Sequence, residues 1–286
     1  MTVATYAAAQ LLRVLPRARI TRAVGRLCDA KLPPAVASAI VRIYTRAYQV
    51  DLAEALQDEG FASFDAFFTR RLREGARTVC PDPDAVVSPA DGRIEAIGEV
   101  DLDGRLAIKG RDYRVQDLIG DAAEARRYQS GQFVVVYLSP RDYHRVHSPV
   151  AGEMRAVRSM PGDLYPVNAI GERHVPSLFA KNRRVAMAID TPTQGRVTVV
   201  MVGAMIVGRI TVTGIDARDV PIGLHALDPP VRLARGDEIG IFHIGSTAVV
   251  FVEPGGCKFT RGTGSVRYGE PLVAPVDPQS NGDTRG

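Results

Sequence analysis

A serine that directly follows a glycine near the C-terminal end could carry out chemistry on its own backbone. Ser246 comes after Gly245, at the start of the strongly apolar run 248–252. A glycine carbonyl has no side chain to block an attacking hydroxyl, and glycine tolerates the strained φ and ψ angles that a rearrangement at the Gly245–Ser246 bond requires. Gly-Ser-Thr is also an ordinary loop-to-strand sequence, so the motif alone leaves a plain junction open.

Two further residues are of the types that activate such a serine. Asp91 lies in Ser-Pro-Ala-Asp-Gly at 88–92, and His147 ends Ser-Pro-Arg-Asp-Tyr-His-Arg-Val-His at 139–147. A histidine can take the hydroxyl proton while a carboxylate orients its imidazole, as in a serine, histidine and aspartate triad. An isolated Asp-Gly pair is also typical of a simple hairpin turn, and that reading of Asp91 stays open.

The segments that lead into and out of these residues are related in sequence. Ser-Pro-Ala-Asp-Gly-Arg-Ile-Glu-Ala-Ile at 88–97 aligns with Ser-Pro-Val-Ala-Gly-Glu-Met-Arg-Ala-Val at 148–157. Each copy predicts a turn followed by a half-buried strand, because Pro and Gly precede alternating apolar and polar residues. We interpret the pair as one hairpin used twice, whose two turns face one another and bring Asp91 and His147 together over Ser246.

Elements that position these residues are mainly β-strands. Helical patterns are concentrated before residue 80, whereas strand patterns separated by turn residues dominate after residue 85. The clearest expected strands are 133–138, 196–202, 205–212, 238–244 and 248–252. We therefore predict an α+β fold. It has a helical region at 1–80, a mainly antiparallel β-sandwich or barrel of two related halves at 81–275, and a disordered tail at 276–286.

Composition places most of the positive charge at the N-terminus. The chain has 286 residues, 45% of them hydrophobic, which is enough for one main domain plus an appendage, and its net charge is +4. Residues 1–50 contain eight Arg and Lys against one acid, a net +7, so the other 236 residues sum to −3. This distribution argues against a nucleic-acid-binding body and favours a basic docking segment.

The basic N-terminal region has the periodicity of amphipathic helices interrupted at Pro33 and Pro34. Its apolar positions at helical spacing are Ile20, Ala23, Val24, Leu27, Val36, Ile40, Ile43, Tyr44 and Tyr48. Helices of this kind suit an anionic bilayer surface. No run of 18 apolar residues and no signal peptide with a cleavage site is evident. Two alternatives remain: the helices pack on the body of the protein, or the arginine-rich start is an organellar transit peptide.

Cysteine and histidine patterns do not predict a metal site. Cys28, Cys80 and Cys257 are odd in number and have no paired spacing, which favours a reducing compartment. His144 and His147 form an H-x-x-H pair, but no third ligand is obviously placed, so metal binding stays a minor alternative.

The ordered motifs of the chain resemble those of the phosphatidylserine decarboxylases. The resemblance covers roughly residues 1–275, and its most specific part is Tyr-Leu-Ser-Pro-Arg-Asp-Tyr-His-Arg-Val-His at 137–147. The other matching motifs are Phe-Phe-Thr-Arg-Arg-Leu at 67–72, Ser-Pro-Ala-Asp-Gly at 88–92, Pro-Gly-Asp-Leu at 161–164, Val-Asn at 167–168, Val-Gly-Ala at 202–204 and Gly-Ser-Thr at 245–247. Ile244 departs from the leucine that many members have there.

The resemblance implies a self-cleaving, pyruvoyl-dependent enzyme. Asp91, His147 and Ser246 would form a charge relay that cuts the chain between Gly245 and Ser246. The resulting large chain 1–245 and small chain 246–286 stay together as a heterodimer. Ser246 would become a pyruvoyl group that forms a Schiff base with the substrate, and the sequence shows no obvious pattern for pyridoxal phosphate.

The proposed reaction suggests roles for three further residues and a location. Protonating the carbanion left by CO₂ needs a local acid, and His144, three residues from His147, is the candidate general acid/base; a hydrogen-bonded structural histidine stays open as the alternative. The loop 161–168 is a candidate pocket wall, in which Tyr165 and Asn168 would bind substrate. The substrate would be phosphatidylserine in an anionic membrane, with the enzyme peripheral on the cytoplasmic face of the inner membrane. A higher homo-oligomer is possible, and no nucleic-acid partner is expected.

Two functions from other classes remain open on the sequence. One is a serine hydrolase that uses Ser246, His147 and Asp91 without cutting itself. The other is a non-enzymatic β-sandwich carrier or binding module, since duplicated hairpins also occur in such domains.

Overall fold

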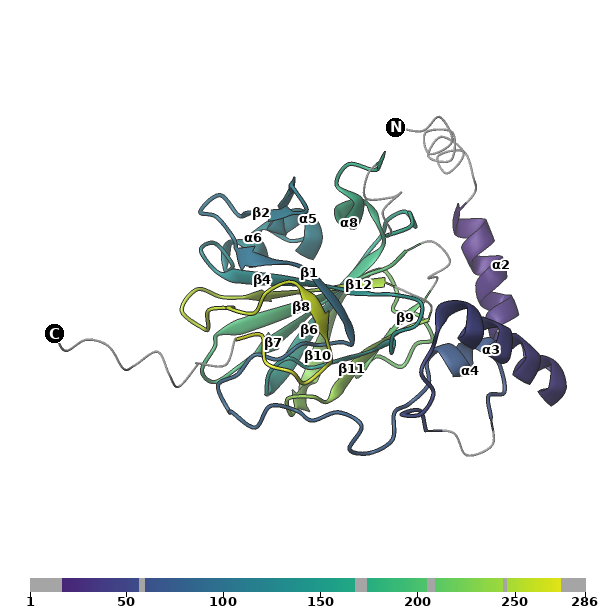
Figure 1. Cartoon of the computed structure of the whole chain (residues 1–286). Helices are drawn as coiled ribbons and strands as arrows, with labels where there is room; N and C mark the ends of the chain where they lie inside the picture. The colour runs from purple at the N-terminus through teal and green to yellow at the C-terminus, as the bar shows by residue number, and fades with distance from the viewer. Residues whose placement is uncertain (1–16, 57–59, 168–173, 205–208, 244–245, 274–286) are drawn as a thin grey trace.

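The α+β class predicted from the sequence is confirmed. The computed structural model describes residues 17–56, 60–167, 174–204, 209–243 and 246–273. The expected disordered tail at 276–286 lies outside these residues. Figure 1 shows the described N-terminal helices gathered at one side of a body made mainly of antiparallel strands.

The N-terminal helices begin and end where the sequence provides the signals. α2 (Arg17–Asp29) and α3 (Pro34–Tyr48) are separated at the two prolines, and Pro34 begins α3 because the first helical position needs no N–H donor. Ser63 caps α4 (Phe64–Phe68) by accepting a hydrogen bond from the backbone N–H of Ala66 at 3.1 Å. None of the described helices is long and apolar enough to cross a bilayer.

Eight strands form the main sheet. In spatial order they are β10 (Gly223–Leu233), β6 (Gly152–Met160), β7 (Arg184–Asp190), β8 (Arg196–Val202), β12 (Ser246–Val252), β4 (Gln132–Leu138), β1 (Gly92–Glu99) and β13 (Gly264–Val266). The barrel that we predicted as one possibility is wrong, because among the described strands the edges β10 and β13 do not pair with each other. Pro229 and Pro230 lie inside β10, and proline within a strand is confined to edges and bulges because it lacks the ladder N–H.

Smaller elements complete the body. A second sheet consists of β5 (Arg145–His147), β11 (Glu238–Phe242) and β9 (Ile210–Val212), and a two-stranded ribbon consists of β2 (Arg105–Ile108) and β3 (Arg111–Arg114). Within the described ranges, the structure has one-turn helices that the sequence reading did not predict: α5 (Val115–Ile119), α6 (Ala122–Arg126) and α8 (Leu178–Lys181). The strand expected at 205–212 is described only as β9, and residues 205–208 lie outside the description.

The core lies on and around the central strands of the main sheet. Every residue of 247–252 in β12 and of 197–202 in β8 is buried. Both strands read as continuous apolar runs, rich in valine, which is typical of strands covered on both faces. Because β12 lies between β4 and β8, Ser246 begins a strand at the centre of the molecule.

The prediction that the two related turns face one another is borne out by their hydrogen bonds. The Val87 N–H donates to the Pro149 carbonyl at 3.0 Å, and the His147 N–H donates to the Pro89 carbonyl at 2.7 Å, so the two turns bond each other reciprocally. The same β-bulge follows each turn, between Ile94 and Ala96 in β1 and at the matching positions 154 and 156 of β6. The two turns therefore face one another, as their sequences predict.

Candidate active site

The contact between the two turns, which we call the joint, carries different side chains on its two sides. Position 147 of the second copy is histidine where the first copy has Val87, and position 91 of the first copy is aspartate where the second has Ala151. The reciprocal hydrogen bonds hold these positions close together. The duplication therefore leaves one carboxylate and one imidazole at a buried junction.

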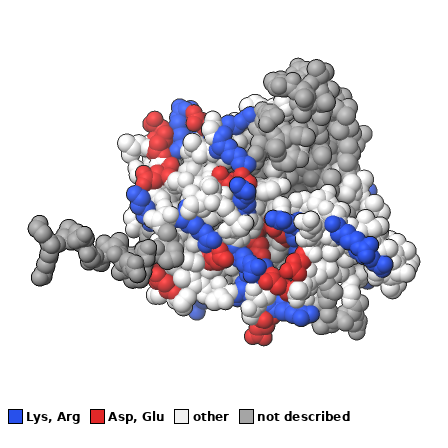
Figure 2. Space-filling model, viewed as in Figure 1, with Lys and Arg blue, Asp and Glu red and all other residues white. Residues whose placement is uncertain are grey.

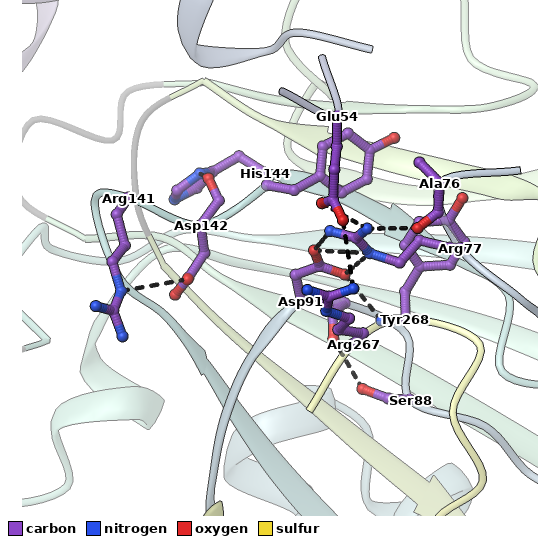
Figure 3. A network of polar contacts seen from close by, with 12 residues as sticks. Glu54, Ala76, Arg77, Ser88, Asp91, Arg141, Asp142, His144, Arg267 and Tyr268 are labelled. Carbon is purple, nitrogen blue, oxygen red and sulfur yellow. Dashed lines mark hydrogen bonds and ion pairs between the residues drawn. The ribbon is translucent and has the colours of Figure 1, made fainter. Parts of the chain in front are cut away.

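Asp91 is held by an arginine that the sequence reading did not single out. Arg77 donates to both carboxylate oxygens of Asp91, with Nη2 2.5 Å from Oδ2 and Nε 3.1 Å from each oxygen (Figure 3). The backbone N–H of Tyr268 donates to Oδ1 at 2.9 Å, and Glu54 binds the other side of the Arg77 guanidinium at 2.7 Å. Asp91 is only 7% exposed, so this buried carboxylate is fully paired.

His147 is positioned as a proton acceptor. Its Nδ1 lies 2.7 Å from the Gly236 carbonyl oxygen, which can only accept, so Nδ1 carries the proton. Nε2 then accepts a hydrogen bond from the Tyr143 hydroxyl at 3.1 Å. Burial lowers the pKa of His147 and raises that of Tyr143, which keeps the imidazole neutral and the phenol protonated.

Asp91 and His147 are joined through Tyr268 rather than directly. The Tyr268 ring stacks on the His147 ring, with centroids 3.8 Å apart and 3° between the planes, while its N–H binds Asp91. Among the hydrogen bonds of the described residues, none links the Asp91 carboxylate to the His147 imidazole. In this arrangement the Gly236 carbonyl fixes the tautomer of His147, and Asp91 contributes charge nearby.

His144 is a buried, neutral histidine with one free nitrogen. It has no exposed surface, and its Nδ1 donates to the Asp142 carbonyl at 2.8 Å. Its Nε2 has no partner among the described residues. Burial lowers the pKa of His144 to about 3, so the imidazole is neutral and Nε2 carries a lone pair rather than a proton.

The Phe-Phe-Thr-Arg motif of α4 supports the loop that carries His144. The Phe68 ring lies 4.1 Å from the His144 ring, centroid to centroid. Arg70 donates through Nη2 to the carbonyls of Arg141 and Asp142 at 3.1 and 3.3 Å. Because Arg70 is only 5% exposed, its charge lies inside the contact between the helical region and the body.

Backbone pairing places Ser246 beside the loop of His144. Ser246 pairs with Leu138 at the end of β4, and the N–H of Phe242 at the end of β11 donates to the His144 carbonyl at 3.0 Å. The end of β11 and the start of β12 are thus each bonded to the segment between β4 and β5 or to its edge. Gly245 lies outside the described residues, and for Ser246 the description covers only the backbone.

Of the two expected substrate-binding residues, Tyr165 lies in the described part of the chain. Tyr165 is half-buried, and its backbone exchanges two hydrogen bonds with the Asn182 side chain, at 2.9 and 2.8 Å. Asn168 lies outside the described residues. In the described part of the chain, His, Cys, Asp and Glu form no group of three or more that could hold a metal ion.

A polar pocket of about 560 Å³ opens next to this network. Asp91, Tyr143, Arg70 and Arg77 contribute to its wall, together with Tyr137. Arginines and carboxylates are both numerous in the lining, so the pocket is polar without being of one sign. It gives solvent access to the Asp91 side of the joint.

The sequence reading missed the partners that fix Asp91 and His147, namely Arg77, Tyr143, Tyr268 and the Gly236 carbonyl. One signal for the last two was available. Two segments each contain a glycine followed by an acidic residue, Gly236-Asp237 and Gly269-Glu270. Each segment bonds one of the two turns in the same way. Gly236 and Asp237 exchange backbone hydrogen bonds with Ser148 at 2.9 and 2.7 Å, as Gly269 and Glu270 do with Ser88 at 3.0 and 2.8 Å.

Acid should destabilise the uncut protein through His144. Its pKa falls from 6.5 to about 3 on folding. Between these values the unfolded chain binds a proton that the folded chain does not, so the free energy of unfolding falls as the pH falls, by up to about 1.4 kcal/mol per pH unit. In a Ser246→Ala background, the loss of Tm between about pH 7 and about pH 5 should be smaller for His144→Gln, since glutamine does not titrate.

His147 is present both in the Ser246→Ala protein and in the same protein with His144→Gln. It therefore contributes equally to the loss of Tm in the two proteins. Thermal unfolding at the two pH values measures the difference. An equal loss of Tm in both proteins would contradict a neutral, buried His144.

Comparison with known proteins identifies the class. A family model described as phosphatidylserine decarboxylase matches residues 64–274. A phosphatidylserine decarboxylase proenzyme of Azotobacter vinelandii is 42% identical over 83% of this chain and 86% of its own length. One of Bordetella pertussis is 39% identical over 91% of this chain and 92% of its own.

These matches place the protein in the decarboxylase class of enzymes. The chain belongs to the phosphatidylserine decarboxylase family, which confirms the resemblance drawn from its motifs.

Proposed function

We propose that this enzyme converts phosphatidylserine to phosphatidylethanolamine and CO₂ with a pyruvoyl group that it makes from Ser246. The observation that carries the proposal is His147 at the joint of the two turns, with Nε2 free of a proton and the charge of Asp91 nearby. The name proenzyme, given to the relatives, supports a maturation step.

In maturation, His147 acts as the base. It takes the hydroxyl proton of Ser246, whose Oγ attacks the Gly245 carbonyl, so that an ester replaces the peptide bond. β-Elimination then breaks the bond between Cβ of residue 246 and the ester oxygen. This frees residues 1–245 with a C-terminal carboxylate and leaves dehydroalanine at 246, and hydrolysis of dehydroalanine releases ammonia.

Two buried polar atoms beside the junction fit a polar group formed at residue 246. Nε2 of His144 and Oγ1 of Thr247 have no hydrogen-bond partner among the described residues. Buried polar atoms without partners are costly and uncommon. The pyruvoyl ketone supplies the electron sink that loss of CO₂ from an amino acid requires.

His144 serves the decarboxylation step as a proton carrier. A substrate ammonium must lose a proton before its nitrogen can act as a nucleophile, and the carbon that loses CO₂ must later gain one. His144 Nε2 carries no proton in the resting site, so it enters the reaction as the acceptor. Its pKa of about 3 must rise when the charged substrate binds for it to take the first proton and return it to the carbon. His144, the general acid/base expected from the sequence, thus acts first as a proton acceptor and then as a proton donor.

The direct test of the proposal is the composition of the purified protein. Intact-mass spectrometry distinguishes one chain of 286 residues from two chains that meet between Gly245 and Ser246. The small chain should weigh one ammonia less than its serine form and should be blocked to N-terminal sequencing.

We infer that α2 and α3 dock the enzyme on an anionic membrane, on the cytoplasmic face of the inner membrane. α3 has two apolar faces: Ala37 and Val41 are buried, whereas Val36, Ile40 and Ile43 are exposed. The alternative that these helices pack on the body therefore accounts for only one face. Leu27 of α2 and Ile43 are each 69% exposed, and apolar residues next to arginines suit a lipid surface.

The remaining surface gives no competing basic patch in the view of Figure 2. Lys and Arg are interspersed there with Asp and Glu. On this face, therefore, no basic patch among the described residues competes with the N-terminal region for anionic lipid.

Removing N-terminal charge should weaken membrane binding. Each basic residue near an anionic bilayer contributes on the order of 1 kcal/mol at low salt, within a Debye length of about 8–10 Å. Changing Arg13, Arg17, Arg19, Arg22 and Arg26 to glutamine should lower co-sedimentation with anionic vesicles and activity on bilayer substrate, while self-cleavage is spared. Unchanged co-sedimentation at low salt would show that the membrane is contacted elsewhere.

A further inference from the structure

A cluster of charged side chains holds His243, which lies three positions before Ser246. Nδ1 of His243 lies 2.8 and 3.0 Å from the two carboxylate oxygens of Asp65 in α4. A carboxylate only accepts, so Nδ1 carries a proton, and Nε2 can accept from the Thr211 hydroxyl 3.4 Å away. Both His243 and Asp65 are largely buried, with 14% and 17% of their side chains exposed.

The same cluster reaches the end of helix α2. Arg209 binds both carboxylate oxygens of Asp29, with Nη2 2.6 Å from Oδ1, and the same nitrogen lies 3.3 Å from Asp65 Oδ1. Arg218 adds a second contact to Asp29 at 2.6 Å. The guanidinium of Arg209 therefore bridges α2 and α4.

Arg209 also fixes the backbone of His243. The His243 N–H donates to the Arg209 carbonyl at 3.1 Å. Ser246, on the other side of the cleavage point, is fixed by its pairing with Leu138 at the start of β12. The two residues between them, 244 and 245, thus connect two anchored ends, one in the charged cluster and one in the central sheet.

The geometry points to His243 as a positioning residue for self-cleavage, held by Asp65 and, through Arg209, by the end of helix α2. The inference rests on the proposed cut between Gly245 and Ser246. An attack within one short segment depends strongly on how its ends are placed, and a misplacement of about 1 Å can cost 10²-fold in rate. The N-terminal helical region thereby becomes part of what makes maturation fast.

A pair of amide substitutions separates positioning from general polarity. Asparagine places its NH₂ close to the position of histidine Nδ1, whereas glutamine places it further out, near Nε2. In His243→Asn the bond to Asp65 is kept, and cleavage should stay within about threefold of wild type. In His243→Gln it is lost, and cleavage should slow by about 10- to 100-fold.

The rate is measured by pulse-labelling in cell-free translation, following the appearance of chain 1–245 on gels, with Tm measured on the same variants in a Ser246→Ala background. His225→Ala, on the edge strand β10, is the matched control and should cleave at the wild-type rate. Equal rates for the asparagine and glutamine variants would overturn the inference.

Asp29→Asn tests the link to α2, because it removes the charge that Arg209 bridges. We expect it to slow cleavage several-fold, and a wild-type rate would overturn that link. A wild-type protein that never cleaves at Gly245–Ser246 would instead contradict the proposed function itself, so the two failures are distinguishable.

Discussion

The Ser246→Ala protein should remain a single uncut chain with no decarboxylase activity. Alanine supplies neither the hydroxyl that attacks the Gly245 carbonyl nor the carbon skeleton with a leaving oxygen from which the ketone is made. Wild type purified in parallel should give chains 1–245 and 246–286. Intact-mass spectrometry and release of CO₂ from phosphatidylserine measure the two properties on the same samples.

Ser159→Ala is a matched control for this substitution. Ser159 is buried in β6 and donates a hydrogen bond to the Val220 carbonyl at 3.3 Å, outside the two turns that carry Asp91 and His147. That variant should still cut, although its folding is less stable. A Ser246→Ala protein that still splits would show that the ketone has another origin. An intact wild-type chain that a fluorophosphonate acylates would favour the serine hydrolase instead.

Substitution of the two histidines should give two different failures. His147→Ala removes the proton acceptor for Ser246 and should stall maturation, leaving the full-length chain. His144→Ala should still cut but turn over slowly, since loss of a positioned general acid or base typically costs about 10²–10⁴-fold. Gel analysis of processing and a CO₂ assay normalised to the cleaved fraction separate these effects.

The separation of roles has a clear contrary outcome. His144 lies next to β11 through its backbone carbonyl and packs on Phe68, so its loss also perturbs packing. His144→Gln keeps a polar side chain of similar length and controls for that perturbation. If both His144 variants block cleavage as fully as His147→Ala, the two histidines share one role.

The sequence was sufficient to predict the elements that repeat. The Ser-Pro turns, the glycines at 92 and 152 and the alternating residues after them are local signals, so the facing turns followed from two matching segments. The apolar runs of β4, β8 and β12 were equally legible, because strands buried on both faces need few polar residues.

What remained unpredicted depends on contacts between distant parts of the chain. Arg77 binds Asp91, and Tyr268 stacks on His147, because the folded chain brings these distant residues together. Neither Arg77 nor Tyr268 stands in a motif that indicates this role. The barrel was a wrong prediction for the same reason. Strand patterns specify alternation, whereas closure depends on whether the edge strands meet, and the prolines of β10 leave it at an edge.

The central position of β12 has a consequence for what a cut at its first residue would do. The strand is bonded to β4 on one side and β8 on the other along its length, and the side chains from Thr247 to Val252 are buried between the layers. A break in the covalent chain there would remove one connection and none of this ladder. The first strand of the fragment 246–286 would stay hydrogen-bonded between β4 and β8 without a covalent link to the larger chain. Separating the two chains would therefore require denaturant rather than dilution.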